Sequence, residues 1–163
     1  TRNGLGLLDA STLGKIVVKG PDAGRFLDML YTNMMSTLKP GRTRYGIMLR
    51  EDGMVMDDGV MARLDERRFY LTTTTGGAAN VLAWLESWLQ TEWPELEVFL
   101  TSLTDHFSTI AVVGPNSRKV LEKVGCTIDL GKDEFPFMAV REAQLGGYSV
   151  QLFWVSFSGE LAF

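Results

Sequence analysis

The chain has 163 residues, of which 45% are hydrophobic, and a formal net charge of −4 at pH 7, a composition that supports a buried core and excludes a disordered protein. The acidic balance argues against nucleic-acid binding, which depends on clustered positive charge, and no apolar run approaches the roughly 20 residues of a membrane span. One cysteine and one histidine exclude an internal disulfide, a Cys-based zinc site and a His-rich metal site, so we expect no metal and a reducing, cytoplasmic location.

The first clear pattern is a strand, a turn and a helix that occur twice. A β-branched run at 16–18 predicts a strand, Gly20-Pro21 ends it, and apolar residues at i, i+3, i+4 and i+7 predict a helix over 23–30. At one constant offset, the run at 110–113, the pair Gly114-Pro115 and a second apolar stripe repeat this pattern. The repeat predicts an internal duplication with pseudo-two-fold symmetry.

The segments between and after the two copies read mainly as hairpin strands. Strand-like runs are expected at 44–49, 54–63, 68–73, 138–144 and 148–157, with hairpin signals at Asp52-Gly53 and Gly146-Gly147. An apolar stripe predicts a further helix over about 76–90. Together these elements predict an α+β fold with a mainly antiparallel sheet and packed helices.

The domain organisation follows from the repeat. No low-complexity linker separates the copies, so we expect one domain over 1–163, built from two intertwined halves of about 1–95 and 96–163 that share one core. The chain starts without Met and stops inside an alternating apolar run, and we interpret it as part of a longer polypeptide.

Two adjacent acids lie in the middle of an apolar strand. Because alternate residues share a strand face, Asp58 is expected to lie on the face of Met54, Met56 and Val60, and Asp57 on the other. Buried carboxylates are costly unless they are hydrogen-bonded, so this pair indicates ligand binding or base catalysis. The alternative is a kink or bulge at Gly59 that turns both acids into water.

The run Thr72–Gly77 ends a strand and opens a helix. Its hydroxyl groups and the free helix N–H groups favour an anionic ligand, whereas the alternative is a simple N-cap by Thr74 or Thr75. No Gly-rich phosphate loop and no serine nucleophile motif is present.

Six tracts, taken in chain order, carry a resemblance to a known family: Gly4–Ser11, Val18–Ala23, Tyr31–Asn33, Gly53–Asp58, Ile110–Pro115 and Ser158–Glu160. They resemble the aminomethyltransferase family, the T-protein of glycine cleavage, and cover essentially the whole chain at the family's folate-binding half. Within the family, the tracts Ala10–Lys15, Glu86–Pro94 and Phe135–Met138 are most similar to the C-terminal part of the alpha subunit of heterotetrameric sarcosine oxidase.

The resemblance implies a tetrahydrofolate site that captures a one-carbon unit as 5,10-methylenetetrahydrofolate. It implies Asp58 as the catalytic acid–base group, and it implies five further residues as folate contacts: Tyr45, Val60, Thr74, Phe157 and Glu160. Thr74 falls where the T-protein has an asparagine, and Phe157 replaces a family tyrosine.

The resemblance also implies partners, namely folate and the other subunits of a hetero-oligomeric oxidase, with FAD, FMN and NAD held elsewhere in the complex. Two alternatives stay open. One is a folate-binding module without catalysis, and the other is a relative of the T-protein or of dimethylglycine dehydrogenase.

Overall fold

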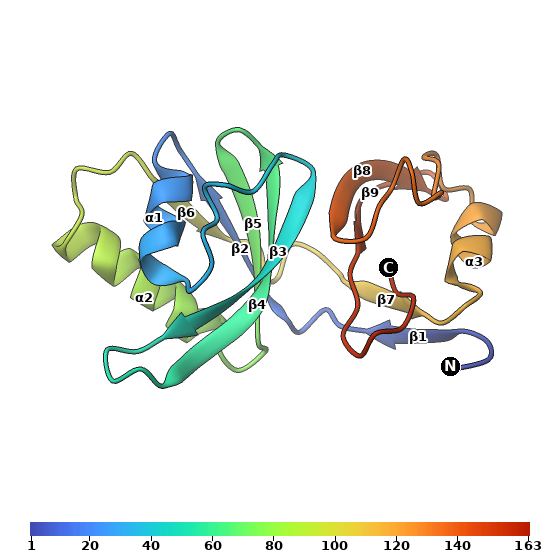
Figure 1. Ribbon diagram of the computed structural model, residues 1–163, viewed down its shortest axis with the longest axis horizontal. Helices are drawn as coiled ribbons and strands as arrows, with labels where there is room; N and C mark the ends of the chain where they lie inside the picture. The colour runs from blue at the N-terminus through green and yellow to red at the C-terminus, as the bar shows by residue number, and fades with distance from the viewer. The chain divides into compact units, whose positions relative to one another are not determined.

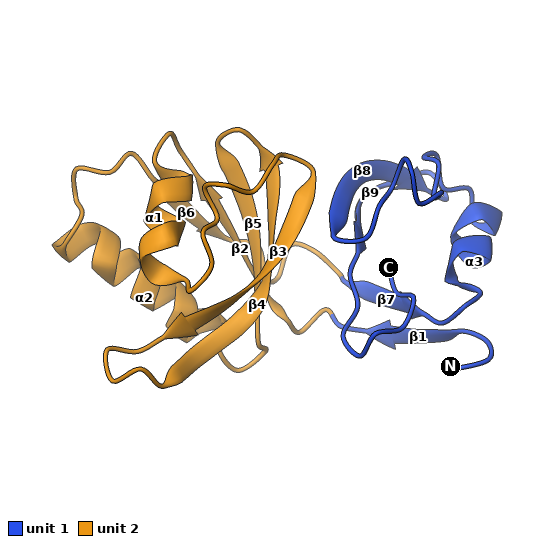
Figure 2. Cartoon of the chain, viewed as in Figure 1, with its two compact units in different colours: residues 1–10, 109–163 blue, residues 11–108 orange.

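The computed structural model describes residues 1–163, which divide into two compact units (Figures 1 and 2). Unit 1 contains residues 1–10 and 109–163, and unit 2 contains residues 11–108. The boundary thus falls after residue 108 rather than near 95, and the first ten residues belong with the C-terminal part of the chain. Each unit has its own cluster of buried side chains.

Unit 2 is built on an antiparallel sheet with the strand order β6-β2-β5-β4-β3. The three hairpin strands expected before residue 75 and the helix expected over 76–90 are all present, with ends shifted by no more than two residues. The elements of the unit are β2 (Gly14–Lys19), α1 (Ala23–Leu30), β3 (Arg42–Leu49), β4 (Val55–Asp65), β5 (Arg68–Thr73), α2 (Ala78–Thr91) and β6 (Phe99–Ser102).

Helices α1 and α2 cover one face of this sheet and supply much of the core (Figure 1). Phe26 and Leu27 of α1 and Leu85 of α2 are fully buried, because each lies on the apolar stripe that the sequence predicts. Trp84 and Trp88 are partly buried against this core and pack edge to face, with ring centroids 5.5 Å apart.

Unit 1 pairs the start of the chain with its last third. β1 (Gly6–Asp9) runs antiparallel to β7 (Ile110–Val113), and the helix α3 (Ser117–Lys123) follows. β8 (Ala139–Leu145) and β9 (Tyr148–Trp154) form the second predicted hairpin, whose turn has positive φ at Gly146 and Gly147. The mainly antiparallel α+β class is therefore confirmed, and none of the three helices is long and apolar enough to cross a membrane.

The two Gly-Pro turns have the same local geometry. Gly20 and Gly114 have φ of 141° and 122°, where a side chain is disfavoured, and the residues before each helix, Asp22 and Asn116, have φ/ψ of −95°/5° and −94°/5°. In each turn the N–H of the first helical residue donates to the glycine carbonyl, at 3.2 and 3.0 Å. The repeated strand–turn–helix is thus observed within each unit, and the pseudo-two-fold relation between the copies stays a prediction.

Candidate functional site

A β-bulge in the β3–β4 hairpin sets the orientation of the acid pair. Asp57 lies opposite Met48, but the next pair joins Leu49 to Val55, so Met56 is an extra residue. Met56 packs against the core of unit 2, and the strict alternation is interrupted there. Asp58 and Val60 therefore lie on the same face of β4, as predicted. The prediction that Met56 also lies on this face is wrong.

Asp57 is the buried member of the pair, with 5% of its surface exposed. Its Oδ1 atom accepts the backbone N–H of Asp58 at 2.7 Å and that of Thr74 at 3.1 Å. Its Oδ2 atom is buried without a hydrogen-bond partner and lies against Gly77, where an added Cβ would come within 2.0 Å of it. The alternative in which a bulge turns both acids into water is wrong for Asp57.

Asp58 and Tyr45 form a hydrogen-bonded pair on the opposite face of the hairpin. Tyr45 lies opposite Val60, so Tyr45 and Asp58 are diagonal neighbours across the two strands. The Tyr45 hydroxyl donates to Asp58 Oδ2 at 2.6 Å, and this bond is the main cause that raises the pKa of the Tyr45 phenol. Tyr45 is 47% exposed, and Asp58 Oδ1 has no partner within the chain. An oriented carboxylate with one open oxygen is therefore accessible at this face.

Val60 is held by a reciprocal contact with β5. Its N–H donates to Thr72 Oγ1 at 2.9 Å, and the Thr72 hydroxyl donates to the Val60 carbonyl at 3.1 Å. Between Asp58 and Val60, a Cβ on Gly59 would lie 1.9 Å from the Thr72 carbonyl oxygen. A glycine is thus required for β5 to approach β4 next to Asp58.

Thr74 lies in the loop that leads from β5 into α2. The N-cap residue of α2 is Gly77, so the alternative in which Thr74 or Thr75 is the N-cap residue is wrong. Thr74 Oγ1 nevertheless accepts the Gly77 N–H at 3.1 Å, and the Thr75 hydroxyl bonds the Thr12 hydroxyl at 3.1 Å. Both threonines therefore stabilise the loop, and the Thr74 backbone is tied to Asp57.

Phe157 and Glu160 belong to unit 1, in the turn after β9. The Phe157 side chain is fully exposed. The Glu160 carboxylate accepts the N–H groups of Phe157 at 3.1 Å and Ser158 at 2.9 Å, and also the Ser158 hydroxyl. These bonds, led by the Ser158 hydroxyl, lower the pKa of Glu160 from 4.5 to about 2. In this structure the Glu160 carboxylate therefore stabilises the turn formed by residues 157–160.

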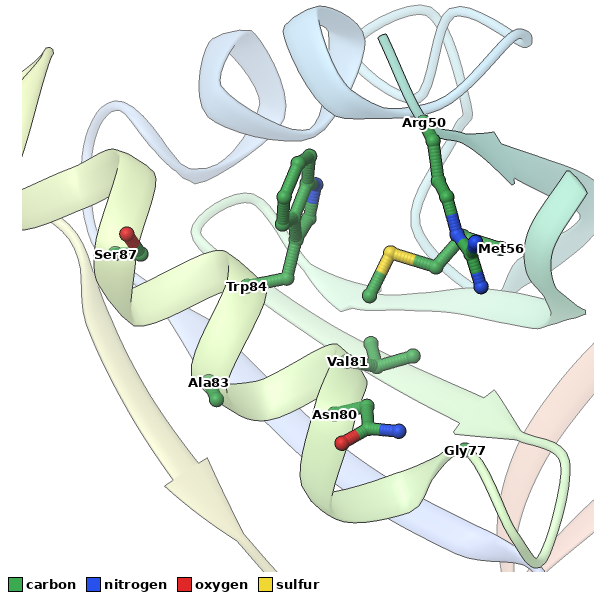
Figure 3. A pocket seen from close by; sticks show the side chains of 8 residues that line it. All are labelled: Arg50, Met56, Gly77, Asn80, Val81, Ala83, Trp84 and Ser87. Atoms are coloured by element: carbon green, nitrogen blue, oxygen red, sulfur yellow. The ribbon is translucent and has the colours of Figure 1, made fainter. Parts of the chain in front are cut away.

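Unit 2 also contains a cavity that the sequence did not indicate (Figure 3). The cavity has a volume of about 350 Å³ and lies between the end of the β3–β4 hairpin and α2. Arg50 and Met56 from the hairpin face Trp84 and Val81 of α2, and Gly77 forms one end. The six residues that the resemblance implies for catalysis and folate contact do not line it.

Comparison with known proteins identifies the family. The model of the GCVT N-terminal domain matches residues 1–163. The chain belongs to this family. Sarcosine oxidase alpha subunits from Corynebacterium sp. (strain U-96) and Rhizobium meliloti (strain 1021) are 55% and 46% identical to it over 99% of the chain. An aminomethyltransferase from Bacillus velezensis is 34% identical over 99% of the chain. The inferred resemblance is thereby confirmed.

The solved structures agree with this assignment. The glycine cleavage system aminomethyltransferase T from Bartonella henselae superposes with a TM-score of 0.84 at 30% identity, over 99% of this chain and 41% of that protein. A chain of the heterotetrameric sarcosine oxidase from Corynebacterium sp. U-96, in complex with pyrrole 2-carboxylate, matches with a TM-score of 0.66 over 97% of this chain and 72% of its own length. At 17% identity this second likeness shows the fold alone.

The chain corresponds to less than half of the length of the curated relatives that it matches. The chain spans 17% of the length of the Corynebacterium sarcosine oxidase alpha subunits and 42% of the Bacillus aminomethyltransferase.

Proposed function

We propose that this chain is the tetrahydrofolate-binding, one-carbon-accepting domain of a sarcosine oxidase-like enzyme. The family membership and the 55% identity to a sarcosine oxidase alpha subunit support the choice of enzyme. The observation that carries the chemistry is the Tyr45–Asp58 pair, in which one carboxylate oxygen is held at 2.6 Å and the other is open.

The residues present fit a folate. A reduced pterin offers N–H donors and amine nitrogens, and the open Asp58 Oδ1 is an acceptor that nothing in the chain occupies. Tyr45 and Val60 lie opposite each other beside it and offer partly exposed apolar surface for a flat ring. Thr74, Phe157 and Glu160 stay proposed contacts. Tetrahydrofolate, when bound, supplies nitrogen nucleophiles that take up a one-carbon unit at the oxidation level of formaldehyde to give 5,10-methylenetetrahydrofolate.

The geometry of Asp58 supports the proposed acid–base role. A carboxylate can accept the proton that an amine loses as it attacks, and it can stabilise positive charge that develops at the carbon. Because Tyr45 donates to Oδ2, the carboxylate is held in one orientation and needs little reorganisation during the reaction.

The test uses the whole protein that contains this chain, with sarcosine and tetrahydrofolate as substrates. We expect Asp58→Asn to lower the formation of 5,10-methylenetetrahydrofolate by roughly 10²-fold or more, the usual effect of a lost acid–base group. Oxidation of the amine, followed as formaldehyde released without folate, should continue. The matched control is Asp105→Asn, which changes an exposed aspartate of the same unit. Unchanged folate-coupled turnover in Asp58→Asn would overturn the assignment.

The same assay separates the alternatives. A folate module without catalysis would bind folate but show no loss of coupling in Asp58→Asn, and a T-protein-like enzyme would not use sarcosine. Partner subunits of a hetero-oligomeric oxidase, with FAD, FMN and NAD bound elsewhere, and a cytoplasmic location belong to the same proposal.

A further inference from the structure

Asp57 connects two separate segments that carry proposed folate contacts. Its Oδ1 atom accepts the Asp58 N–H on β4 at 2.7 Å and the Thr74 N–H before α2 at 3.1 Å. One buried carboxylate oxygen thus fixes the backbone of the proposed acid–base residue relative to the loop that carries Thr74. Asp57 itself lies on the core side of the hairpin, opposite the fully buried Met48, and cannot be a ligand contact of the exposed face.

The two segments that Asp57 connects meet beside the cavity between the β3–β4 hairpin and α2. Met56 and Gly77, the neighbours of Asp57 on the strand and on the loop, both line the cavity of about 350 Å³ (Figure 3). Met56 also packs against the core of unit 2, whereas Gly77 has no side chain to pack. The Val60–Thr72 bonds already join β4 to the end of β5, and the Asp57 bonds extend this connection from Asp58 to the loop at Thr74.

The second oxygen of Asp57 also bears on the start of α2. Asp57 Oδ2 is buried without a hydrogen-bond partner, next to Gly77 at the N-terminus of a helix that has no acidic residue in its first turn. A negative charge at a helix N-terminus is stabilising, so the position of the carboxylate favours α2 as it stands. Its charge also reaches the core, where burial and, second, Asp57 raise the pKa of Tyr31.

We propose that Asp57 is the positioning residue of the candidate folate site, aligning Asp58 and Thr74 through its Oδ1 atom. This inference rests on the proposed folate function. The resemblance implies a role for Asp58 alone, and a residue that bonds only backbone N–H groups carries no signature in a strand pattern.

The experiment compares Asp57→Ala with Asp57→Asn in the whole protein. An asparagine retains an Oδ1 acceptor for both N–H groups, whereas an alanine removes it. We expect Asp57→Ala to lower kcat/KM for tetrahydrofolate by about 10- to 100-fold, since a displacement near 1 Å can cost about 10²-fold. We expect Asp57→Asn to restore most of this loss, in contrast to Asp58→Asn. Amine oxidation without folate serves as the internal standard for folded enzyme, and Asp105→Ala is the matched control.

Hydrogen exchange measured by mass spectrometry supplies a readout besides activity. In Asp57→Ala, peptides that contain the Asp58 and Thr74 amides should exchange faster, and in Asp57→Asn they should stay protected. If Asp57→Ala fails to fold, Gly77→Ala replaces it, because the added Cβ would come within 2.0 Å of Asp57 Oδ2 and displace the carboxylate without removing it.

The outcomes are distinct. If the wild-type protein couples amine oxidation to folate and Asp57→Ala does so equally well, the positioning role is overturned and the proposed function is not. An Asp57→Asn variant as impaired as Asp57→Ala also overturns it, because charge rather than alignment would then be required. A wild-type protein without folate coupling overturns the proposed function and, with it, this role of Asp57.

Discussion

Gly59 provides the sharpest test of how the sheet builds the site, because it lies between Asp58 and Val60. A Cβ at this position would lie 1.9 Å from the Thr72 carbonyl oxygen and 2.8 Å from its carbon, both atoms of the β5 backbone. Overpacking costs about 1–3 kcal/mol, and a backbone obstacle cannot rotate away, so we expect Gly59→Ala to lose about 2–3 kcal/mol of unfolding free energy. At roughly 2–4 °C per kcal/mol for a chain of this size, Tm should fall by roughly 4–12 °C.

The assay is thermal unfolding followed by tryptophan fluorescence, which reports mainly on unit 2 because Trp84, Trp88 and Trp93 all lie there. Gly76→Ala is the matched control, since an added Cβ would meet no atom within 4 Å and its φ is not in the left-handed region. That variant should unfold at the wild-type temperature or slightly above it. If Gly59→Ala and Gly76→Ala unfold at the same temperature, the close approach of β5 to β4 is not as described.

Two further predictions concern the core of unit 2 and the turn of unit 1. Leu85→Ala should lower the unfolding free energy by about 2–5 kcal/mol in urea titration, and Leu89→Ala, which is only partly buried, should cost less. NMR titration should give a Glu160 pKa of about 2, and Ser158→Ala should raise it toward 4.5. Because the folded-state pKa is lowered, the bonds of Glu160 contribute fully above pH 4.5 and are lost as pH falls through about 2. A Glu160 pKa near 4.5 in the wild type, or equal losses in the two leucine variants, would contradict these accounts.

Local patterns were sufficient for most of the secondary structure. The β-branched run of β2, the turn at Gly20 and the apolar stripe of α1 are each set by residues that are close in sequence, and all are observed as expected. β1 and β6 were missed, because neither four-residue segment has a β-branched run like that of β7, and each depends on a partner strand far along the chain. The division into two units depends on the same long-range pairing of β1 with β7.

The acid pair shows where pattern reasoning fails at the site. The alternation of side chains along a strand correctly predicted that Asp58 and Val60 share a face. The extra residue Met56 shifts this alternation by one position before Asp57, and a strand pattern does not reveal such a bulge. A site role for Tyr45 was predicted only from the resemblance. Its position as a diagonal neighbour of Asp58 depends on the strand register, which the structure supplies.

Lys15 shows a buried charge that no pattern predicts. It is 1% exposed, yet its ammonium group donates to the carbonyls of Ser11 at 2.8 Å and Leu13 at 2.9 Å. Its hydrogen bonds are made to backbone atoms whose positions depend on the folded loop, so its burial could not be inferred from residue type.

The most direct test of the central claim is a crystal structure of the whole protein with a stable reduced folate such as 5-formyltetrahydrofolate. The proposed function predicts the pterin ring on the exposed face of the β3–β4 hairpin, with a ring nitrogen within hydrogen-bond distance of Asp58 Oδ1 and the Tyr45–Asp58 bond retained. A folate bound instead in the cavity between Arg50 and Trp84, or away from Asp58 altogether, would contradict it.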